Sequence, residues 1–532
     1  MSSLNGVVSW RLALGAASAI FILSKVFKLL NGIKAVNGVR GLRVPFQPLA
    51  MPAVIFPSSW WNPGVYFTWS ERLTFYRKWG SEVVSIVPFL SGRPTLYTSN
   101  IDVARQVVAG GIKSPWIKPE SASQAMMIWG MNLIASEKET WRRHRRIMGP
   151  AFNPKTYSLV WSETLRIFKD MVSSEGWDTK DSVEIAVIQE YTFKLALYVI
   201  SSVGFGLPFI WDAPPTNEDG SMPLQEAFKT FTDHPTLWLA APKWLYKLPF
   251  KWIPDLPAAH SVLQNYMTIQ INERKVALAS DSSGTESQRS DVFSLLVRAN
   301  NEDEKLQLDD SEVIGNVFGL LFAGHETTAH TLAATLGFLG IHPQIQKEVY
   351  EEIIQVIGHD RDPTYEDFNK LEKVLSVFYE SLRLYPAGYV MIREAIEDTV
   401  LTIPSELGKP GNRSIAIQKG AQVVVDMVGV QYNPRYFTDP YKYDPSRWYG
   451  TMNDSEAASA FSFGPRTCIG RHFAAMEAVC FLTLLIKDWH VEPIMKEGET
   501  GEQWRERVMP AAMMLTLGVS PVPVRLRRRS HS

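Results

Sequence analysis

Cysteine is scarce in this chain, and its scarcity excludes several kinds of site. The 532 residues include only two cysteines, Cys468 and Cys480. They suggest no disulfide framework, and they are too few for a cysteine-rich iron–sulfur or zinc site. The composition therefore favours a reducing compartment and leaves at most one thiolate ligand in any one place.

Net charge is also nearly absent. The formal net charge is −1, so the chain has no general attraction to nucleic acid, and we predict no nucleic-acid partner. No glycine-rich flavin or nicotinamide fingerprint occurs, so electrons from such a cofactor would have to come from a separate protein. We interpret the basic C-terminal run as a short solvated tail; it contains Arg525, Arg527, Arg528 and Arg529.

The N-terminus is apolar. Residues 12–23 carry no charge, and apolar residues continue past two lysines to residue 30. An uncharged run of this length is too short for a span, which takes about twenty residues, but terminal lysines can snorkel and let residues 8–30 cross. We predict a retained membrane anchor over residues 1–30. A cleaved signal peptide and an amphipathic surface helix are the alternatives.

Basic residues flank this apolar stretch. Arg11 precedes it, and a larger basic group follows it: Lys25, Lys28, Lys34, Arg40 and Arg43. By the positive-inside rule, the body of the protein then faces the cytoplasm. We therefore predict a single-pass membrane protein.

Prolines dominate residues 31–63, which we interpret as a Pro-rich hinge because they cannot form a long helix. Residues 64–532 show no internal repeat and no composition shift, so we predict a single domain there. Strands are expected at residues 82–88, 94–98 and 422–430. Helices are expected from residue 101, over much of 141–278, and over 313–339, 370–385 and 471–485, with Asp309, Asp310 and Ser311 as N-cap candidates before residue 313. The predicted fold class is mainly α with a minor β part.

The first motif that indicates chemistry is FSFGPRTCIG, residues 461–470. Cys468 lies in a loop before a helix, where backbone N–H groups and the helix N-terminus stabilise a thiolate. Gly464 and Gly470 permit a flat ligand to approach the backbone, and Arg466 can pair with an anionic group. Cys480 lies in an apolar helix, and we interpret it as a core residue.

The second motif is AGHETT, residues 323–328, inside the long apolar helix. His325 and Glu326 are costly to bury without partners. A solvated surface face is the simpler interpretation, but the apolar flanks favour a helix that crosses the interior and meets a ligand. The acid Glu326 beside the alcohol Thr327 suits a proton relay.

Two further motifs carry charge. Glu380 and Arg383 share one helix face, a weak signal that gains meaning from a second arginine, Arg447. In WRRHRR, residues 141–146, Trp141 and Arg145 share a face that is suited to an anionic cofactor. The remaining arginines are Arg142, Arg143 and Arg146, and they are candidates for a patch that docks an acidic partner. A solvated basic helix is the alternative.

Together these motifs resemble the cytochrome P450 superfamily, over residues 141–485. The cysteine signature Phe-x-x-Gly-x-Arg-x-Cys-x-Gly is met at Phe461, Gly464, Arg466, Cys468 and Gly470. The oxygen-activation motif is met at Ala323, Gly324, Glu326 and Thr327, and the structural triad at Glu380, Arg383 and Arg447. The apolar N-terminus and the Pro-rich hinge look like the microsomal type, which implies a location in the endoplasmic reticulum membrane.

The resemblance implies a cytochrome P450 fold, a triangular helical body around a buried haem b. Cys468 would ligate the iron, and Glu326 and Thr327 would be catalytic. The propionates would be held by Trp141, Arg145, Arg393 and Arg466. The sequence departs from the family pattern at Ser446, where glutamate is usual, and at Gln431, where histidine is frequent. Both departures concern secondary contacts.

The implied activity is haem-thiolate monooxygenation, the insertion of one oxygen atom from O₂ into an apolar small molecule. Electrons would come from a separate NADPH-cytochrome P450 reductase, with cytochrome b5 as a further candidate donor. The alternatives are a haem-thiolate isomerase or dehydratase, which Glu326 and Thr327 argue against, and a haem-binding sensor or carrier without turnover.

The substrate is less well defined by the sequence. Trp238, Trp244 and Trp252 alternate with lysines in residues 235–257, a pattern that suits a membrane interface as well as core packing. Entry from the bilayer would favour a terpenoid, sterol, fatty acid or xenobiotic. The sequence resembles fungal secondary-metabolism or detoxifying members, which leans toward terpenoids.

Overall fold

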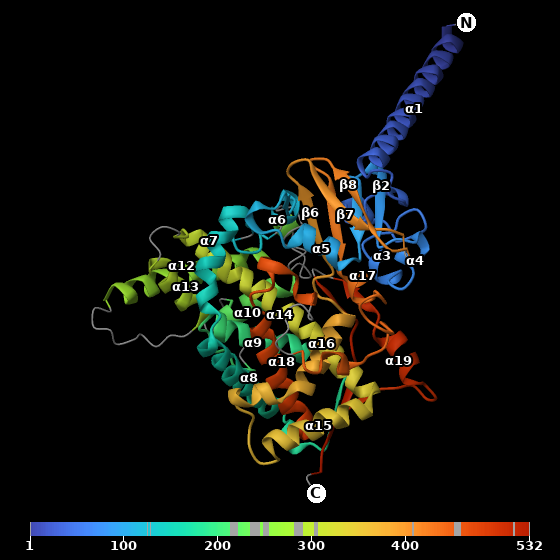
Figure 1. The fold of residues 1–532 in the computed structure, drawn as a ribbon. Helices are drawn as coiled ribbons and strands as arrows, with labels where there is room; N and C mark the ends of the chain where they lie inside the picture. The colour runs from blue at the N-terminus through green and yellow to red at the C-terminus, as the bar shows by residue number, and fades with distance from the viewer. Residues whose placement is uncertain are drawn as a thin grey trace. The chain divides into compact units, whose positions relative to one another are not determined.

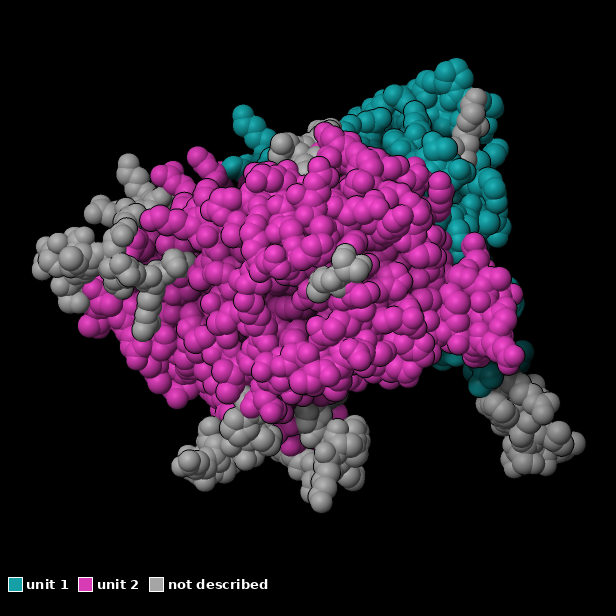
Figure 2. Space-filling view, turned by 90° about the horizontal axis from the view of Figure 1, so that it is seen from below, with its two compact units in different colours: residues 1–119, 389–441, 463–466 teal, residues 120–388, 442–462, 467–532 magenta. Residues whose placement is uncertain are grey.

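The computed structural model describes residues 2–124, 126–127, 129–212, 222–234, 245–247, 255–280, 291–302, 307–406, 409–451, 459–513 and 516–530. The chain divides into two compact units whose segments alternate along the sequence (Figure 2). Unit 1 comprises Met1–Pro119, Tyr389–Tyr441 and Phe463–Arg466, and unit 2 comprises Glu120–Gly388, Lys442–Ser462 and Thr467–Ser532. The tryptophans of the predicted interface, Trp238, Trp244 and Trp252, lie outside the described residues.

Unit 1 is built on a six-stranded sheet of order β1-β2-β3-β9-β6-β4, in which β1 and β2 and also β3 and β9 are parallel (Figure 1). The strands are β1 Gly41–Phe46, β2 Val83–Ser91, β3 Thr95–Thr98, β9 Gln422–Asp426, β6 Val390–Ala395 and β4 Trp116–Ile117, and a separate hairpin pairs β7 Thr399–Pro404 with β8 Asn412–Ile417. Val83 and Val87 of β2 lie in one apolar cluster, whereas Val84 and Ile86 lie in another. Successive side chains of a strand point to opposite faces, so both faces of the sheet are buried.

The helices of unit 1 are short except at the N-terminus. They are α1 Ser2–Ala35, α2 Met51–Ile55, α3 Phe67–Ser70, α4 Phe75–Trp79, α5 Ile101–Val108 and α17 Met427–Gln431. The segment predicted as the Pro-rich hinge thus holds the end of α1, β1 and α2, but no long helix of its own. The block at residues 422–430, predicted as one strand, becomes a helix after Asp426 because the Asp426 side chain caps α17 by accepting the Gly429 N–H.

α1 contains a long apolar stretch. An 18-residue window within Leu12–Ala35 has a mean hydropathy of 1.7, and none of its residues is buried. Among the described residues this is the one helix that is long and apolar enough to cross a membrane. The helix continues past residue 30, and Leu29, Ile33 and Val36 pack on the apolar cluster of unit 1. The end of α1 is therefore part of the folded unit.

Unit 2 is mostly helical (Figure 1). Its longest helix, α14 (Asp310–Ile341), begins after Asp309, one of the three N-cap candidates, and Asp309 forms a reciprocal capping box with Glu312. α14 packs closely on α9. The other helices are α6 Glu120–Gln124, α7 Lys138–Met148, α8 Pro154–Ser174, α9 Gln189–Phe205, α10 Leu224–Asp233, α12 Leu256–Ser280, α13 Val292–Glu302, α15 Pro343–Ile357, α16 Glu372–Leu384, α18 Arg471–Asp488 and α19 Gly501–Val508.

Two small sheets complete unit 2. One has the order β10-β13-β5, from Trp489–Pro493, Val524–Arg528 and Ser182–Ile185, and the other pairs β11 Ala511–Met513 with β12 Leu517–Val519. The C-terminal basic run is therefore not a solvated tail, as the sequence suggested. Arg525 pairs with Glu184, and Arg527 lies 3.3 Å from Glu492. Val524 and Leu526 alternate with these arginines and are fully buried, which fixes the strand in place. The predicted fold class, mainly α with a minor β part, is confirmed.

Candidate active site

Cys468 lies in a tight loop directly before α18. The Cys468 backbone N–H donates to the Phe461 carbonyl at 2.9 Å, which closes the loop. Ser462 adopts a left-handed backbone with φ of 74° within this turn. The Cys468 side chain is accessible, whereas Cys480 is fully buried in α18, as predicted. Cys468 is thus the cysteine that can reach a ligand.

The surroundings of the Cys468 thiol act on its pKa in opposite directions. Burial of the loop raises the pKa, although a small molecule can reach the side chain. The Gly470 N–H and the charges of Arg145 and Arg471 lower it. These donors and cations oppose the cost of burial and would stabilise a thiolate that binds a cationic metal.

The two glycines of the cysteine motif have different roles. A Cβ at Gly464 would lie 2.6 Å from the Ala109 side chain, and its φ is 64°, so packing and backbone both require glycine there. This reason differs from the ligand approach that the sequence suggested. A Cβ at Gly470 would meet only the Cys468 Sγ, at 3.9 Å. Packing within the described chain therefore leaves Gly470 free to lie against a flat group on the thiol.

The middle of α14 presents one accessible face in an otherwise buried helix. Gly319, Ala323 and Thr327 follow one another at four-residue spacing and are accessible, while most of their neighbours are buried. The Thr327 hydroxyl donates to the Ala323 carbonyl at 2.9 Å. Gly324 serves packing, because a Cβ there would lie 3.2 Å from Ile200 of α9. The alcohol of the motif is thus available to a ligand on this face.

The charged residues of the same motif have the partners that their burial requires. The Glu326 Oε1 accepts from the Thr516 hydroxyl at 2.6 Å and from the Thr516 N–H at 3.2 Å. The His325 Nδ1 lies 2.9 Å from the Leu321 carbonyl. Sequence reasoning missed Thr516, since nothing in its local pattern links it to a residue so far away in the chain.

Glu380, Arg383 and Arg447 come together in a buried cluster. Arg383 donates to both oxygens of Glu380, at 2.9 and 2.8 Å, and both side chains are fully buried. The Arg447 Nε lies 3.4 Å from Glu380. The Trp448 indole and the Asp444 N–H also donate to Glu380, at 2.9 and 3.0 Å. These last two donors were not predicted. The cluster fastens η6 (Pro445–Trp448) to α16.

The predicted propionate residues lie in both units. Trp141 is nearly buried on α7, and Arg145, on the same helix, interacts electrostatically with Cys468. Burial lowers the pKa of Arg145. In unit 1, Arg393 is nearly buried on β6, and Arg466 lies in η8 (Gly464–Arg466).

The other arginines of α7 do not share one free patch. Arg143 forms an ion pair with the mostly buried Glu312 of α14, so it binds inward. Arg142 is exposed and lies 3.4 Å from Glu139 on its own helix. Arg143 is therefore not part of the predicted docking patch.

A mostly apolar pocket lies beside α14 in unit 2. Its larger lining side chains are Met126, Trp129, Asn132, Ile134, Phe318 and Phe322. The Trp129 ring stacks on Phe318 with 3.7 Å between centroids and 6° between planes. Gly319 also lines the pocket, and it lies one turn before Ala323 on the accessible face of α14.

Comparison with known proteins identifies the family. The cytochrome P450 family model matches residues 73–512. The chain belongs to the cytochrome P450 family. It is 31% identical to cytochrome P450 monooxygenase 124 of Postia placenta, over 97% of this chain and 98% of that one. It is 28% identical to a cytochrome P450 monooxygenase of Arthrobotrys oligospora, over 80% of each chain.

A solved structure shows the same fold. The haem domain of cytochrome P450DA matches 92% of this chain and 99% of its own with a TM-score of 0.68, at 19% identity. The P450 fold predicted from the motifs is therefore confirmed. The chain is a P450 monooxygenase, and its family implies haem, O₂, a substrate and a redox partner.

Proposed function

We propose that Cys468 would supply the thiolate that holds the iron of a haem b and that the chain inserts one oxygen atom from O₂ into an apolar small molecule. The observation that carries this proposal is the accessible Cys468 thiol, set before α18 beside the Gly470 N–H, Arg145 and Arg471. When bound, a thiolate-ligated haem supplies the activation of O₂. Trp141, Arg145, Arg393 and Arg466 would hold the propionates.

Other residues of the motif would pack or position the haem. Phe461 closes the cysteine loop through its carbonyl, and Gly470 leaves room beside the thiol. Glu380, Arg383 and Arg447 would keep η6 in place and would not touch substrate. The family match covers segments of both units, which supports residues 64–532 acting as one catalytic domain.

Thr327 and Glu326 would deliver the protons that the reaction needs. Thr327 holds its hydroxyl on the accessible face of α14, and Glu326 lies next to it in the chain with Thr516 fixing one of its oxygens. Glu326 would exchange protons with water, and Thr327 would orient a proton toward the reacting oxygen.

The pocket beside α14 would bind the substrate. Aromatic and aliphatic side chains make up most of its lining, and Asn132 adds an amide, so an apolar molecule fits this chemistry better than a charged one. Terpenoids, sterols, fatty acids and apolar xenobiotics share this character.

Electrons would come from a separate NADPH-cytochrome P450 reductase, with cytochrome b5 as a further donor. α1 would anchor the chain in the endoplasmic reticulum membrane with its body facing the cytoplasm. The exposed apolar stretch of α1 and the basic residues around it support this location.

The two cysteines allow a matched test of the ligand. Full-length Cys468→Ser should lose the reduced-CO absorbance band of a thiolate-ligated haem, because an alcohol is a much weaker donor to iron. Cys480→Ser should retain that band, since the Cys480 Sγ contacts the Trp161 carbonyl at 3.6 Å inside the core. Persistence of the band in Cys468→Ser would refute the ligand assignment. Product formation is then read by mass spectrometry with a reductase and a terpenoid and fatty-acid panel.

A further inference from the structure

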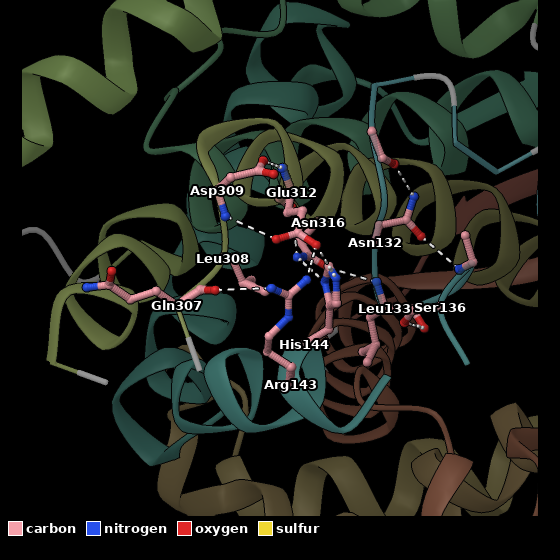
Figure 3. A network of polar contacts seen from close by, with 12 residues as sticks. Asn132, Leu133, Ser136, Arg143, His144, Gln307, Leu308, Asp309, Glu312 and Asn316 are labelled. Carbon is pink, nitrogen blue, oxygen red and sulfur yellow. Dashed lines mark hydrogen bonds and ion pairs between the residues drawn. The ribbon is translucent and has the colours of Figure 1, made fainter. Parts of the chain in front are cut away.

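A polar network joins three parts of unit 2 beside the pocket (Figure 3). α7 contributes Arg143 and His144, the start of α14 contributes Glu312 and Asn316, and the third part is the segment of residues 129–136. Arg143 pairs with Glu312 and donates to the Gln307 carbonyl at 3.3 Å. The Glu312 side chain is thus held between the capping box and α7.

Asn316 connects the three parts. Its Oδ1 accepts the Leu133 N–H at 2.7 Å. Its Nδ2 lies 2.8 Å from the Glu312 carbonyl and 2.7 Å from the His144 Nδ1. A backbone N–H can only donate and a carbonyl can only accept, so both ends of the amide are assigned by their backbone partners.

This assignment determines the form of His144. Because the Asn316 Nδ2 donates, the His144 Nδ1 must accept, which leaves the proton of a neutral ring on Nε2. That nitrogen lies 3.4 Å from the Glu312 Oε1. His144 is fully buried, and burial lowers its pKa. The charged groups that act on this pKa are Glu312 and Arg143.

The segment that Asn316 holds lies directly against α14. A Cβ at Gly315 would lie 2.7 Å from the Met131 carbonyl, so the backbones approach closely there. Asn132 then folds the segment into a turn: its Oδ1 accepts the N–H groups of Ile134 and Ala135, each at 3.0 Å, and its Nδ2 donates to the Met126 carbonyl at 2.6 Å. Asn132 is almost completely buried.

The same turn forms a wall of the pocket. Trp129, Asn132 and Ile134 face it from the segment, and Gly315 and Phe318 face it from α14. Movement of the turn relative to α14 would therefore change the shape of the pocket.

We propose that Asn316 and neutral His144 are positioning residues that hold this turn against α14 and so set where a substrate lies relative to Thr327. This inference rests on the proposed function, in which the pocket binds the substrate. Protonation of the His144 Nδ1 would place a donor against the Asn316 Nδ2 and release the turn.

A matched pair of variants tests the role of Asn316. Asn316→Leu removes a buried amide with two backbone partners. Gln346→Leu removes another buried amide, which bonds the backbone of Leu339 and Val491, at the opposite end of α14. Both variants should lower the thermal midpoint. Only Asn316→Leu should lose hydrogen-exchange protection at residues 129–136.

Two haem-binding probes measure the pocket itself in the holoenzyme. Imidazole reports access to the iron, and 4-phenylimidazole adds an apolar ring for the pocket to hold. Their affinity ratio should fall about tenfold in Asn316→Leu and stay unchanged in Gln346→Leu. An unchanged ratio or an equal fall in both variants overturns the inference. Failure of wild type to bind either probe refutes the proposed function instead.

His144 provides a second, conservative test. In His144→Asn the new Oδ1 can occupy the place of Nδ1 and accept from Asn316, whereas His144→Leu offers no acceptor. The ratio of the affinity for 4-phenylimidazole to that for imidazole should match wild type in His144→Asn and should fall in His144→Leu. In wild type the affinity ratio, corrected for protonation of the two probes themselves, should also fall as pH drops below about 6.5, and His144→Asn should remove that dependence. Equal behaviour of the two variants contradicts the proposal.

Discussion

Glu380 and Glu326 are both buried glutamates of unit 2, and their surroundings differ in kind. Glu380 accepts from two nitrogens of Arg383, from the Trp448 indole and from the Asp444 N–H, and Arg447 lies near it. For Glu326 the structure records two bonds, both from Thr516 and both on Oε1.

This difference separates a structural carboxylate from one that suits proton transfer. Both Glu380 oxygens accept hydrogen bonds, and these bonds join α16 to η6. Glu326 is oriented through a single oxygen and lies beside the accessible face of α14. A carboxylate that exchanges protons needs this partial freedom.

The largest expected effect follows from breaking the Glu380 cluster. Arg383→Leu leaves a charge buried without its bidentate partner, which typically costs about 3–5 kcal/mol. The thermal midpoint should fall strongly, and the yield of protein with a reduced-CO band should fall with it.

The control for this variant has the same sequence spacing. Arg166 donates to Glu163 on α8 at 2.9 Å, but this pair is partly exposed. Arg166→Leu should cost about 1 kcal/mol or less, because solvent already screens the pair. Comparable losses in the two variants would contradict the structural role of the buried pair.

Thr327→Ala tests the other region. The fold should remain, since one partly accessible hydroxyl is lost, but the product formed per NADPH should fall by up to about 10²-fold. The NADPH electrons that do not go into product should instead reduce O₂ to hydrogen peroxide in assays with a reductase.

Thr331→Ala is the matched control, because the Thr331 hydroxyl also donates to a carbonyl of α14, at 2.8 Å, but is buried one turn further along. The product that Thr331→Ala forms per NADPH should match that of wild type. If Thr327→Ala forms as much product per NADPH as wild type, Thr327 has no role in proton transfer.

A third buried glutamate sharpens the comparison. Glu477 of α18 is fully buried, and neither of its oxygens has a hydrogen-bond partner among the described residues. Burial raises its pKa well above the ordinary range. The folded state therefore keeps a proton that the unfolded state releases above that range. The contribution of Glu477 to the free energy of unfolding thus falls by about 1.4 kcal/mol for each pH unit above the ordinary glutamate pKa.

Glu477→Gln should remove this pH dependence of the free energy of unfolding. The stability of the variant relative to wild type should therefore increase from about pH 6 to pH 8. Thermal midpoints across that range provide the measurement. Glu499 is the control, because a hydrogen bond from Arg507 lowers its pKa to about 2, and Glu499→Gln should leave the slope unchanged. A parallel profile for Glu477→Gln and wild type would show that Glu477 is not held as the neutral acid.

Local sequence signals predicted much of the site. The start of α14 near Asp309, the start of α18 after the Cys468 loop and the pairing of Glu326 with the adjacent alcohol of Thr327 all depend on neighbours within four residues or on a single turn. Interactions between residues this close in the chain depend only on the local sequence. Helix ends and loop chemistry can therefore be inferred from it directly.

The predictions that were wrong or missing have a common cause, which is contact between residues far apart in the sequence. The basic run at Arg525 becomes a strand because β10 and β5, far away in the sequence, lie on either side of it. Arg143 turns inward because Glu312 reaches it from another helix. Thr516 and Trp448 gain their roles only through Glu326 and Glu380.

The sequence by itself determined the family motifs, the choice of Cys468 over Cys480 as the candidate ligand, and the helical character of the chain. It gave the same Glu-x-x-Arg spacing to Glu380 and Arg383 as to Glu139 and Arg142, which form an exposed surface pair. Only the tertiary structure decided between them. Burial removes the water that would otherwise solvate and screen the charges, so the same pair is a weak contact on α7 and a rigid fastening on α16.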